Sequence, residues 1–390
     1  MLEQAHALHP QLISWRRDFH QHPELGFAEI QTASKSAEIL EKLGYRVRRN
    51  VGRTGVVAEV GSGSPTVAIR ADMDALPLQE ANAVPYASQT PGVMHACGHD
   101  AHVAMALGAA TLLASAPVHG TVRFLLQPSE EAGDHEGVSG APRMVQDGAM
   151  NGVDLVLALH VDAGTPVGQI QVSAGPSSGG VDSFFGKVIG RGGHGARPQD
   201  TIDPFYLTAH VILALNAVVS RHIAPFDPAV VSLGAVHGGH TQNVIPDQVE
   251  LTGTLRYTET RVQNQIHSEI RRAFEVARAL GGDYDLRFHL GAPPMVNDPR
   301  AVDLIQSVAG ALLGEENVLP IEKDLGAEDF GSFLALAPGA MFMLGVRREG
   351  DERFAHNPAF DIDENALPLG SAILAQAALR FIEEPGKWLS

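Results

Sequence analysis

The 390-residue chain has one cysteine and fewer basic than acidic residues. The first scarcity excludes internal disulfides, and the second argues against polyanionic partners. The lone cysteine, Cys97, cannot form a disulfide within the chain, and such scarcity is typical of a reducing compartment. The net charge of −17 argues against binding to nucleic acids or anionic membranes, because both require a basic face on the protein. We therefore expect a small-molecule substrate, no nucleic-acid partner and no membrane partner.

Long apolar runs are also missing from the chain. No run approaches the ~18 residues of a membrane span, and residues 1–20 lack the apolar core of a signal peptide. Apolar residues still make up 44% of the chain, which is enough for a sizeable core, and charged residues make up 19%. These features favour a cytoplasmic globular protein.

The first part of the chain alternates helical and strand patterns. Helical periodicity covers 2–20, 29–43 and 101–115, and short apolar runs rich in β-branched residues begin at Gly55, Thr66, Thr121 and Asp154. Continuous apolar strands that alternate with helices indicate an α/β fold with a mostly parallel sheet between layers of helices.

A different pattern occupies the middle of the chain. Small residues at 173–180 resemble a linker, and a second hinge is expected at 291–294. Between them the order is strand, helix, strand, strand, helix, strand, which is the ferredoxin-like βαββαβ arrangement. We therefore predict a ferredoxin-like domain over 181–292, inserted into a larger α/β domain made from 1–180 and 293–390.

Polar side chains gather where the predicted strands of the larger domain end, which is where α/β proteins place their functional residues. The clusters are Asp72 with Asp74, then Cys97 with His99 and Asp100, then Glu130 with Glu131, then His160, and finally His356 near the far end of the chain.

Each of these clusters also has an ordinary explanation. A free cysteine is usually a buried structural residue, adjacent glutamates are usually a solvated turn, and a histidine that ends a strand is usually part of the core. Their joint occurrence favours a site, because thiolate, imidazole and carboxylate are ligands for zinc and similar ions. Five ligands could hold two ions ~3.5–4 Å apart, and a neighbouring glutamate could then move protons.

The inserted domain has candidates of its own. His194 lies on a glycine-rich turn where the backbone can approach a ligand closely, and Asn243 precedes a strand. Arg256 lies within a strand, and the fork of its guanidinium suits a substrate carboxylate. A turn histidine, a capping asparagine and a solvated arginine are the alternatives.

The motifs together resemble a known family. RADMDALP, HACGHDAH, PSEE, LALH, GRGGHGARP, NVIPD, GAEDFG and HNPAFDIDENAL occur in this order, and the match runs from RRDFHQHPELGFAE to the last helix. They resemble the N-acyl-amino-acid amidohydrolases, which include hippurate hydrolase, the plant auxin-conjugate hydrolases and N-acetyldiaminopimelate deacetylase. These enzymes belong to a wider group of two-metal exopeptidases with carboxypeptidase G and aminoacylase.

The resemblance implies a catalytic α/β domain with an inserted lid or dimerisation domain, and two divalent ions (zinc, manganese, nickel or cobalt) in each subunit. Cys97 takes the metal-bridging position, and the remaining ligand positions fall on His99, Glu131, His160 and His356. A homo-oligomer, dimer or tetramer, is expected through the inserted domain.

Other roles follow from the same resemblance. Glu130 takes the position of the general acid and base, Asp74 that of an acid that orients the site, and His194 that of a histidine that stabilises the oxyanion. Asn243 and Arg256 resemble residues that hold the substrate, and Asp100 is expected beside the ligands. Asp72 stands where many relatives have a metal-binding histidine, so His99 is expected to cover that role.

The function expected is hydrolysis of the amide bond between an acyl group and an amino acid, in which Glu130 takes a proton from metal-activated water and passes it to the departing amine. One alternative is a metallo-exopeptidase that acts on dipeptides. Another is a metal- or ligand-binding protein without catalysis, which is disfavoured because the chain retains Glu130. A third is a thiol hydrolase that uses Cys97 with a histidine.

Metal removal separates the metal-dependent hydrolase from the thiol hydrolase. We expect a chelator to abolish hydrolysis of an N-acyl amino acid such as benzoylglycine, because the attacking water needs the metal to lose its proton near neutral pH. Initial rates before chelation, after chelation and after addition of zinc, manganese, nickel or cobalt measure the effect. Full activity of the chelated protein would support the thiol hydrolase instead.

Overall fold

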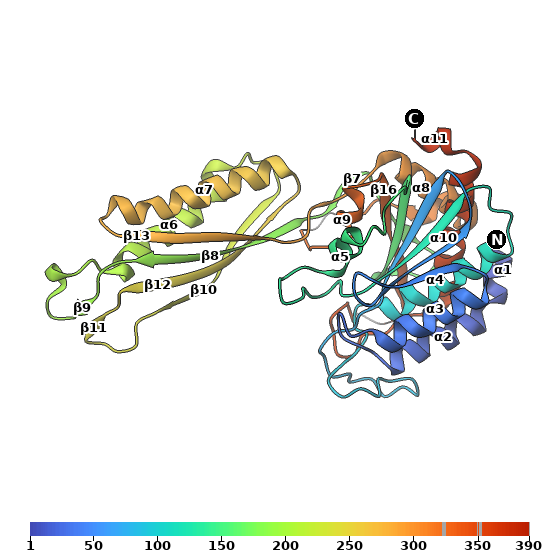
Figure 1. Cartoon of the computed structure of the whole chain (residues 1–390), viewed down its shortest axis with the longest axis horizontal. Helices are drawn as coiled ribbons and strands as arrows, with labels where there is room; N and C mark the ends of the chain where they lie inside the picture. The colour runs from blue at the N-terminus through green and yellow to red at the C-terminus, as the bar shows by residue number, and fades with distance from the viewer. Residues whose placement is uncertain (322–324, 349, 351–352, 390) are drawn as a thin grey trace. The chain divides into compact units, whose positions relative to one another are not determined.

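A computed structural model describes residues 1–321, 325–348, 350 and 353–389, and the chain divides into two compact units (Figure 1). Unit 1 consists of Met1–Ser177, Val296–Glu322 and Asp329–Ser390, and unit 2 consists of Ser178–Met295 and Lys323–Glu328. The domain expected at 181–292 falls inside unit 2.

Unit 1 is built on a mixed sheet whose strand order is β1-β2-β4-β3-β5-β16-β6-β15. Its strands are β1 (Arg46–Val51), β2 (Gly55–Gly61), β3 (Thr66–Asp72), β4 (Thr121–Gln127), β5 (Leu155–Pro166), β6 (Ile170–Gln171), β15 (Val318–Leu319) and β16 (Gly339–Arg347). The central four strands, β4, β3, β5 and β16, are parallel to one another. The predicted α/β fold with a mostly parallel sheet is confirmed.

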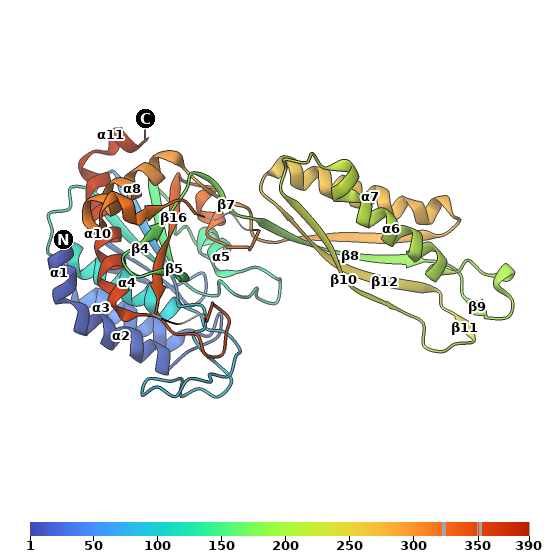
Figure 2. The ribbon, with the colours of Figure 1, turned by 180° about the vertical axis from the view of Figure 1, so that it is seen from behind.

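Helices cover this sheet. They are α1 (Leu2–Ala7), α2 (His9–Gln21), α3 (Ile30–Lys42), α4 (His99–Ala114), α5 (Gly140–Gln146), α8 (Pro299–Leu313), α9 (Gly331–Leu334), α10 (Leu367–Glu383) and α11 (Pro385–Leu389), with short 3₁₀ helices at Glu315–Asn317 and Glu364–Ala366. Figure 2 shows α4 and α10 against the sheet, where both contact β3 and β5. The helix expected over 2–20 is interrupted at Leu8, because Pro10 has no N–H for a continuous helix and instead lies in the first turn of α2.

The core of unit 1 lies between the sheet and helices α4 and α10. After its polar first turn, helix α4 is apolar on all sides and buried along nearly all of its length, as expected for a helix enclosed by other elements. Gly108 permits the close approach of α10, since a Cβ at this position would lie 2.4 Å from Ser371 Oγ. Within Glu364–Glu383 an 18-residue window has a mean hydropathy of 1.2, enough by length and composition to span a membrane, but 78% of this window is buried inside the protein, as in a core helix.

Unit 2 has the predicted ferredoxin-like order. Its main elements are β8 (Gly180–Ile189), α6 (Pro204–His222), β10 (Ala229–Gly238), β12 (Gln248–Tyr257), α7 (Thr260–Ala279) and β13 (Asp283–Leu290), with short strands β9 (Gly193–His194) and β11 (Val244–Ile245) and a 3₁₀ helix at Pro198–Asp200. The short strands β7 (Gly175–Ser178) and β14 (Met295–Asn297) pair with each other where the chain passes between the units. The antiparallel sheet has the order β10-β12-β8-β13. The inserted ferredoxin-like fold is therefore confirmed.

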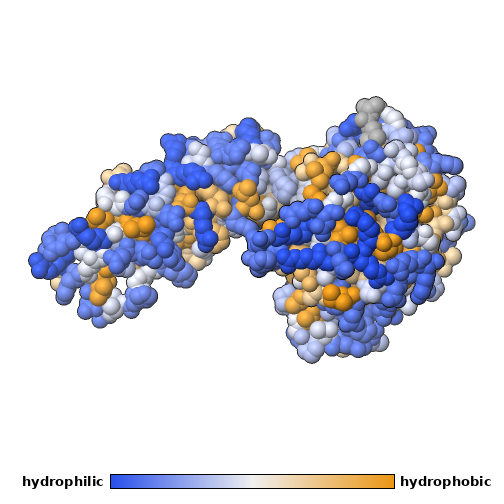
Figure 3. Space-filling view, in the orientation of Figure 1, coloured by the Kyte–Doolittle hydropathy of each residue, from blue (hydrophilic) through white to orange (hydrophobic). Residues whose placement is uncertain are grey.

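Helices α6 and α7 pack together and against the sheet of unit 2. The outward side of α6 is unusually apolar, with Phe205 45%, Tyr206 57% and Leu213 69% exposed. On the face of each unit that Figure 3 presents, hydrophilic residues predominate and apolar residues form smaller patches.

A buried ionic network joins helix α2 to α4 in unit 1. The guanidinium of Arg16 is fully buried, and it donates to Asp100 at 2.8 Å and to Asp361 at 2.9 Å. Burial alone would raise the pKa of Asp100, but the charges of Arg16 and His20 lower this pKa far below its ordinary value. Asp100 therefore contributes stability above its unfolded-state pKa of about 3.9, and this contribution is lost as the pH falls through the lowered pKa.

Loss of Arg16 tests this network. We expect Arg16→Met to lower the free energy of unfolding by about 3–5 kcal/mol, because two buried carboxylates lose their partner. The matched control is Arg17→Met, since Arg17 pairs with Glu364 but is 43% exposed and should contribute at most about 1 kcal/mol. Urea unfolding followed by circular dichroism measures both, and equal small losses would contradict the assignment.

Candidate active site

The site residues of unit 1 gather at one edge of the sheet. Asp72 ends β3 and Asp74 follows it, Glu130 and Glu131 follow β4, and His160 lies in β5. These strands are parallel neighbours, so their carboxyl ends lie at the same edge. The loop before α4 adds Cys97, the first residue of α4 adds His99, and the loop after β16 adds His356.

Two groups of three ligand atoms form there. Cys97, His99 and His160, which we call the His160 triad, have their ligand atoms within 4.8 Å of one another. Cys97, Glu131 and His356, the His356 triad, meet the same limit. The two triads share the sulfur of Cys97, and a thiolate can bridge two ions. The five residues predicted as ligands are therefore brought together.

Hydrogen bonds fix which nitrogen of each histidine faces the site. His99 Nδ1 lies 2.9 Å from the carbonyl oxygen of Asp74, and His160 Nδ1 lies 2.8 Å from that of Val161. A carbonyl only accepts, so both Nδ1 atoms donate and a neutral ring keeps its lone pair on Nε2. His160 Nε2 lies 3.4 Å from Cys97 Sγ, and the buried His99 Nε2 has no hydrogen-bond partner among the described residues.

The loop that carries Cys97 depends on Gly98. Its φ of +95° lies in the left-handed region, and a Cβ there would lie 2.2 Å from Val161 Cγ2. Burial raises the pKa of the Cys97 thiol to about 12. The side chain is therefore protonated near neutral pH without a cation beside it, which disfavours its use as an unaided nucleophile.

The two glutamates follow β4 on a tight turn. Glu131 donates its backbone N–H to Asp74 Oδ2 at 3.0 Å, and its Oε1 lies 3.1 Å from His356 Nε2. His356 has a φ of +64° and is held by a hydrogen bond from its backbone N–H to the oxygen of Ala96 at 2.7 Å. Glu130 lies beside the predicted ligands, since an oxygen of Glu130 forms a further close group with His99 and Glu131.

His102 is a residue that the sequence prediction missed. It donates through Nδ1 to Asp72 at 2.6 Å, and its Nε2 accepts the backbone N–H of Val161 at 3.0 Å. Both nitrogens are used, so His102 supports the site and leaves no lone pair for a metal. Its spacing of three residues from His99 on one helix is the pattern that could have revealed it.

Asp72 and Asp100 lie outside the two triads. Burial would raise the pKa of Asp72, but the charge of Arg70, 2.6 Å away, and those of the histidines lower it well below its usual range. Asp100, expected beside the ligands, instead accepts hydrogen bonds from Arg16 and His20, both at 2.8 Å. It anchors the first turn of α4, which begins at His99.

The candidates in unit 2 fall into two places. Strand β9 carries His194 and pairs with β11, which Asn243 directly precedes. The side chains of His194 and Asn243 are both exposed. Arg256 is opposite Val181 at the start of β8, whereas His194 follows the end of β8. A strand rises about 3.3 Å per residue, so within unit 2 the length of β8 separates Arg256 from His194.

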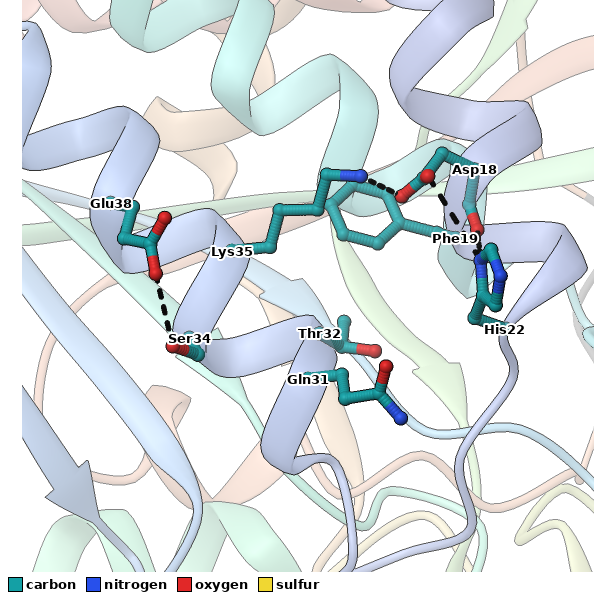
Figure 4. Close-up of a pocket in the computed structure, with 8 residues that line it drawn as sticks. All are labelled: Asp18, Phe19, His22, Gln31, Thr32, Ser34, Lys35 and Glu38. Carbon is teal, nitrogen blue, oxygen red and sulfur yellow. Dashed lines mark hydrogen bonds and ion pairs between the residues drawn. The ribbon is translucent and has the colours of Figure 1, made fainter.

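A pocket of about 330 Å³ between α2 and α3 is a separate feature (Figure 4). In this view Lys35 points toward Asp18, with which it forms an ion pair, and Ser34 donates to Glu38 at 3.4 Å. Asp18 and Lys35 pair with each other and are not directed at a common ligand. None of the predicted site residues lines the pocket.

Comparisons with known proteins agree with this geometry. The model of "Peptidase family M20/M25/M40" matches residues 68–380. An N-acetyl-L-cysteine deacetylase of Bacillus subtilis is 37% identical over 385 residues, which cover 97% of this chain and 89% of the deacetylase. Thermostable carboxypeptidase 2 of Saccharolobus solfataricus is 38% identical over 379 residues, which cover 95% of each chain.

A solved structure is similar over the whole chain. The crystal structure of the Bacillus subtilis YxeP protein, described as a dinuclear metal-binding peptidase of the M20 family, has a TM-score of 0.84 and 35% identity. The alignment covers 97% of this chain and 99% of that one. The chain thus belongs to peptidase family M20/M25/M40, and it is a hydrolase of amide or peptide bonds.

Proposed function

We propose that this enzyme hydrolyses the amide bond of N-acyl amino acids with the help of two divalent cations. The observation that carries the proposal is the pair of triads that share Cys97, with Glu130 beside them and outside both. The His160 triad would hold one cation and the His356 triad the other.

The residues present fit such cations. Two imidazoles donate through Nδ1 and direct Nε2 into the site, and the buried Glu131 Oε1 lies 3.1 Å from His356 Nε2, the nitrogen of the His356 triad. Sulfur and nitrogen ligands favour zinc, although manganese, nickel or cobalt could serve where they are more available. When bound, the cations polarise the substrate carbonyl and lower the pKa of water from ~15.7 toward ~7.

The protein's own groups then move the protons. Glu130 accepts the proton of the attacking water and delivers it to the departing amine. Asp74 holds the ring of His99 and the backbone of Glu131 in place during this exchange. His194 would stabilise the oxyanion, a kind of contact worth on the order of 3–4 kcal/mol. Asn243 and Arg256 would bind the substrate, with Arg256 on its carboxylate.

Association of two copies of the chain would bring residues of unit 2 to the substrate. We infer that two copies associate through α6 and the neighbouring edge strand β10, because α6 exposes Phe205, Tyr206 and Leu213. Arg256 and His194 lie at opposite ends of β8, so one unit 2 does not present both to a small substrate. Unit 2 would thus act as lid and dimerisation domain.

Sedimentation velocity of the intact protein tests this, and a monomer at working concentration contradicts it.

The adjacent glutamates give a matched pair of variants. Glu130→Gln should retain both metals while kcat falls by about 10²–10⁴-fold, because the amide cannot take a proton from water. Glu131→Gln should instead lose metal, because it removes an anionic ligand of the His356 triad. Metal content measured by mass spectrometry and kcat measured on the same preparations distinguish the two. Near-normal turnover of Glu130→Gln would end the assignment.

The substrate class is tested by rates on a panel. Similarity to a protein named a deacetylase supports N-acyl amino acids as the substrate class. Similarity to a protein named a carboxypeptidase supports an exopeptidase as the second candidate function. We expect kcat/KM for benzoylglycine and acetyl amino acids to exceed that for dipeptides on enzyme loaded with each of the four metals. The reverse order would support the exopeptidase.

A further inference from the structure

Glu29 is a buried carboxylate that lies outside the proposed ligand set. It is 0% exposed and directly precedes α3, yet its side chain does not cap that helix. Its Oε1 accepts the backbone N–H of Phe27 at 3.0 Å and that of Ser129 at 2.8 Å. Its Oε2 accepts the hydroxyl of Thr54. The carboxylate therefore links its own loop to the residue before β2 and to the turn after β4.

Ser129 has an unfavourable backbone conformation that its neighbours hold in place. Its φ of +44° lies in the left-handed region, which residues with a Cβ rarely adopt. The hydroxyl donates to the oxygen of Ala132 at 2.7 Å, and the carbonyl accepts the N–H of Gly140 at 2.8 Å. Glu29 supplies the partner of the remaining polar group, the N–H of Ser129.

Ser129 directly precedes Glu130, so its conformation sets the direction of the Glu130 side chain. On the other side of Glu130, the N–H of Glu131 is bound by Asp74 at 3.0 Å. Glu29 and Asp74 come from different segments, and their two carboxylates hold the backbone before and after Glu130. Strained conformations held by several contacts are typical of functional sites.

We propose that Glu29 is a positioning residue, which holds Ser129 in its left-handed conformation and thereby aims Glu130 at the substrate. The inference rests on the proposed function, because it takes Glu130 as the group that moves the proton. Glu29 acts through hydrogen-bond geometry and touches no substrate.

Glutamine is a close replacement for Glu29. Its carbonyl oxygen can accept both N–H groups, and its amide can donate to the Thr54 hydroxyl. Burial raises the pKa of Glu29 to about 7, so a neutral side chain suits this environment. Methionine has a similar length but removes every acceptor. Thr54→Val removes only the contact of Oε2 and leaves the bond to Ser129.

Steady-state kinetics and metal content of the holoenzyme test the proposal. Glu29→Met should lower kcat by about 100-fold, the size of effect expected for misplacement by about 1 Å, with KM within about twofold and both metals retained. Glu29→Gln and Thr54→Val should keep kcat within about threefold. If Glu29→Met does not fold, Glu29→Asp decides, since its shorter stem keeps a carboxylate but cannot reach Ser129.

Three results would overturn the inference. They are normal kcat in folded, metal-loaded Glu29→Met, a loss of kcat that merely follows a loss of metal, and an equal loss in Glu29→Gln. If the wild-type enzyme hydrolyses no substrate of the panel, the proposed function fails instead. Crystal structures of wild type and Glu29→Met then decide: a Ser129 that leaves the left-handed region in the variant supports the positioning role, and one that stays there contradicts it.

Discussion

Asp74 is the residue on which the geometry of the site most depends. Its backbone oxygen accepts from His99 Nδ1, and its side-chain Oδ2 accepts the N–H of Glu131. Burial would raise the pKa of this carboxyl, but the bonds from His99 and from the glutamate turn lower it. One residue, through its backbone oxygen and its carboxylate, thus orients the ring of His99 and the backbone of Glu131, two predicted ligands from segments far apart in the chain.

Charge compensation separates the supporting carboxylates from the ligands. Asp72 has Arg70 at 2.6 Å, and Asp100 has Arg16 at 2.8 Å, so each of these two acids pairs with an arginine. Buried charges require such partners. The oxygen of Glu131 and the sulfur of Cys97 instead have histidines as neighbours. A bound cation would supply the positive charge that compensates this carboxylate and thiolate.

Much of the fold could be predicted from local patterns. The strand expected from Thr121 is β4 without change, and the βαββαβ order of the inserted domain needed only the spacing of apolar runs and turns. Other features could not be predicted this way. Strand β1 contains three arginines within six residues and has no apolar pattern, so only its pairing with β2 reveals it. The break at Leu8 depends on the position of one proline.

The sequence by itself determined which residue types could bind metal and that they follow strand ends, because these properties lie in side-chain chemistry and in short-range periodicity. Only the tertiary structure decided which nitrogens face the site, that Asp100 is bound by Arg16 and His20, and that His102 and Glu29 hold neighbouring groups. These outcomes depend on hydrogen bonds between residues that are far apart in the chain, and no local pattern specifies such partners.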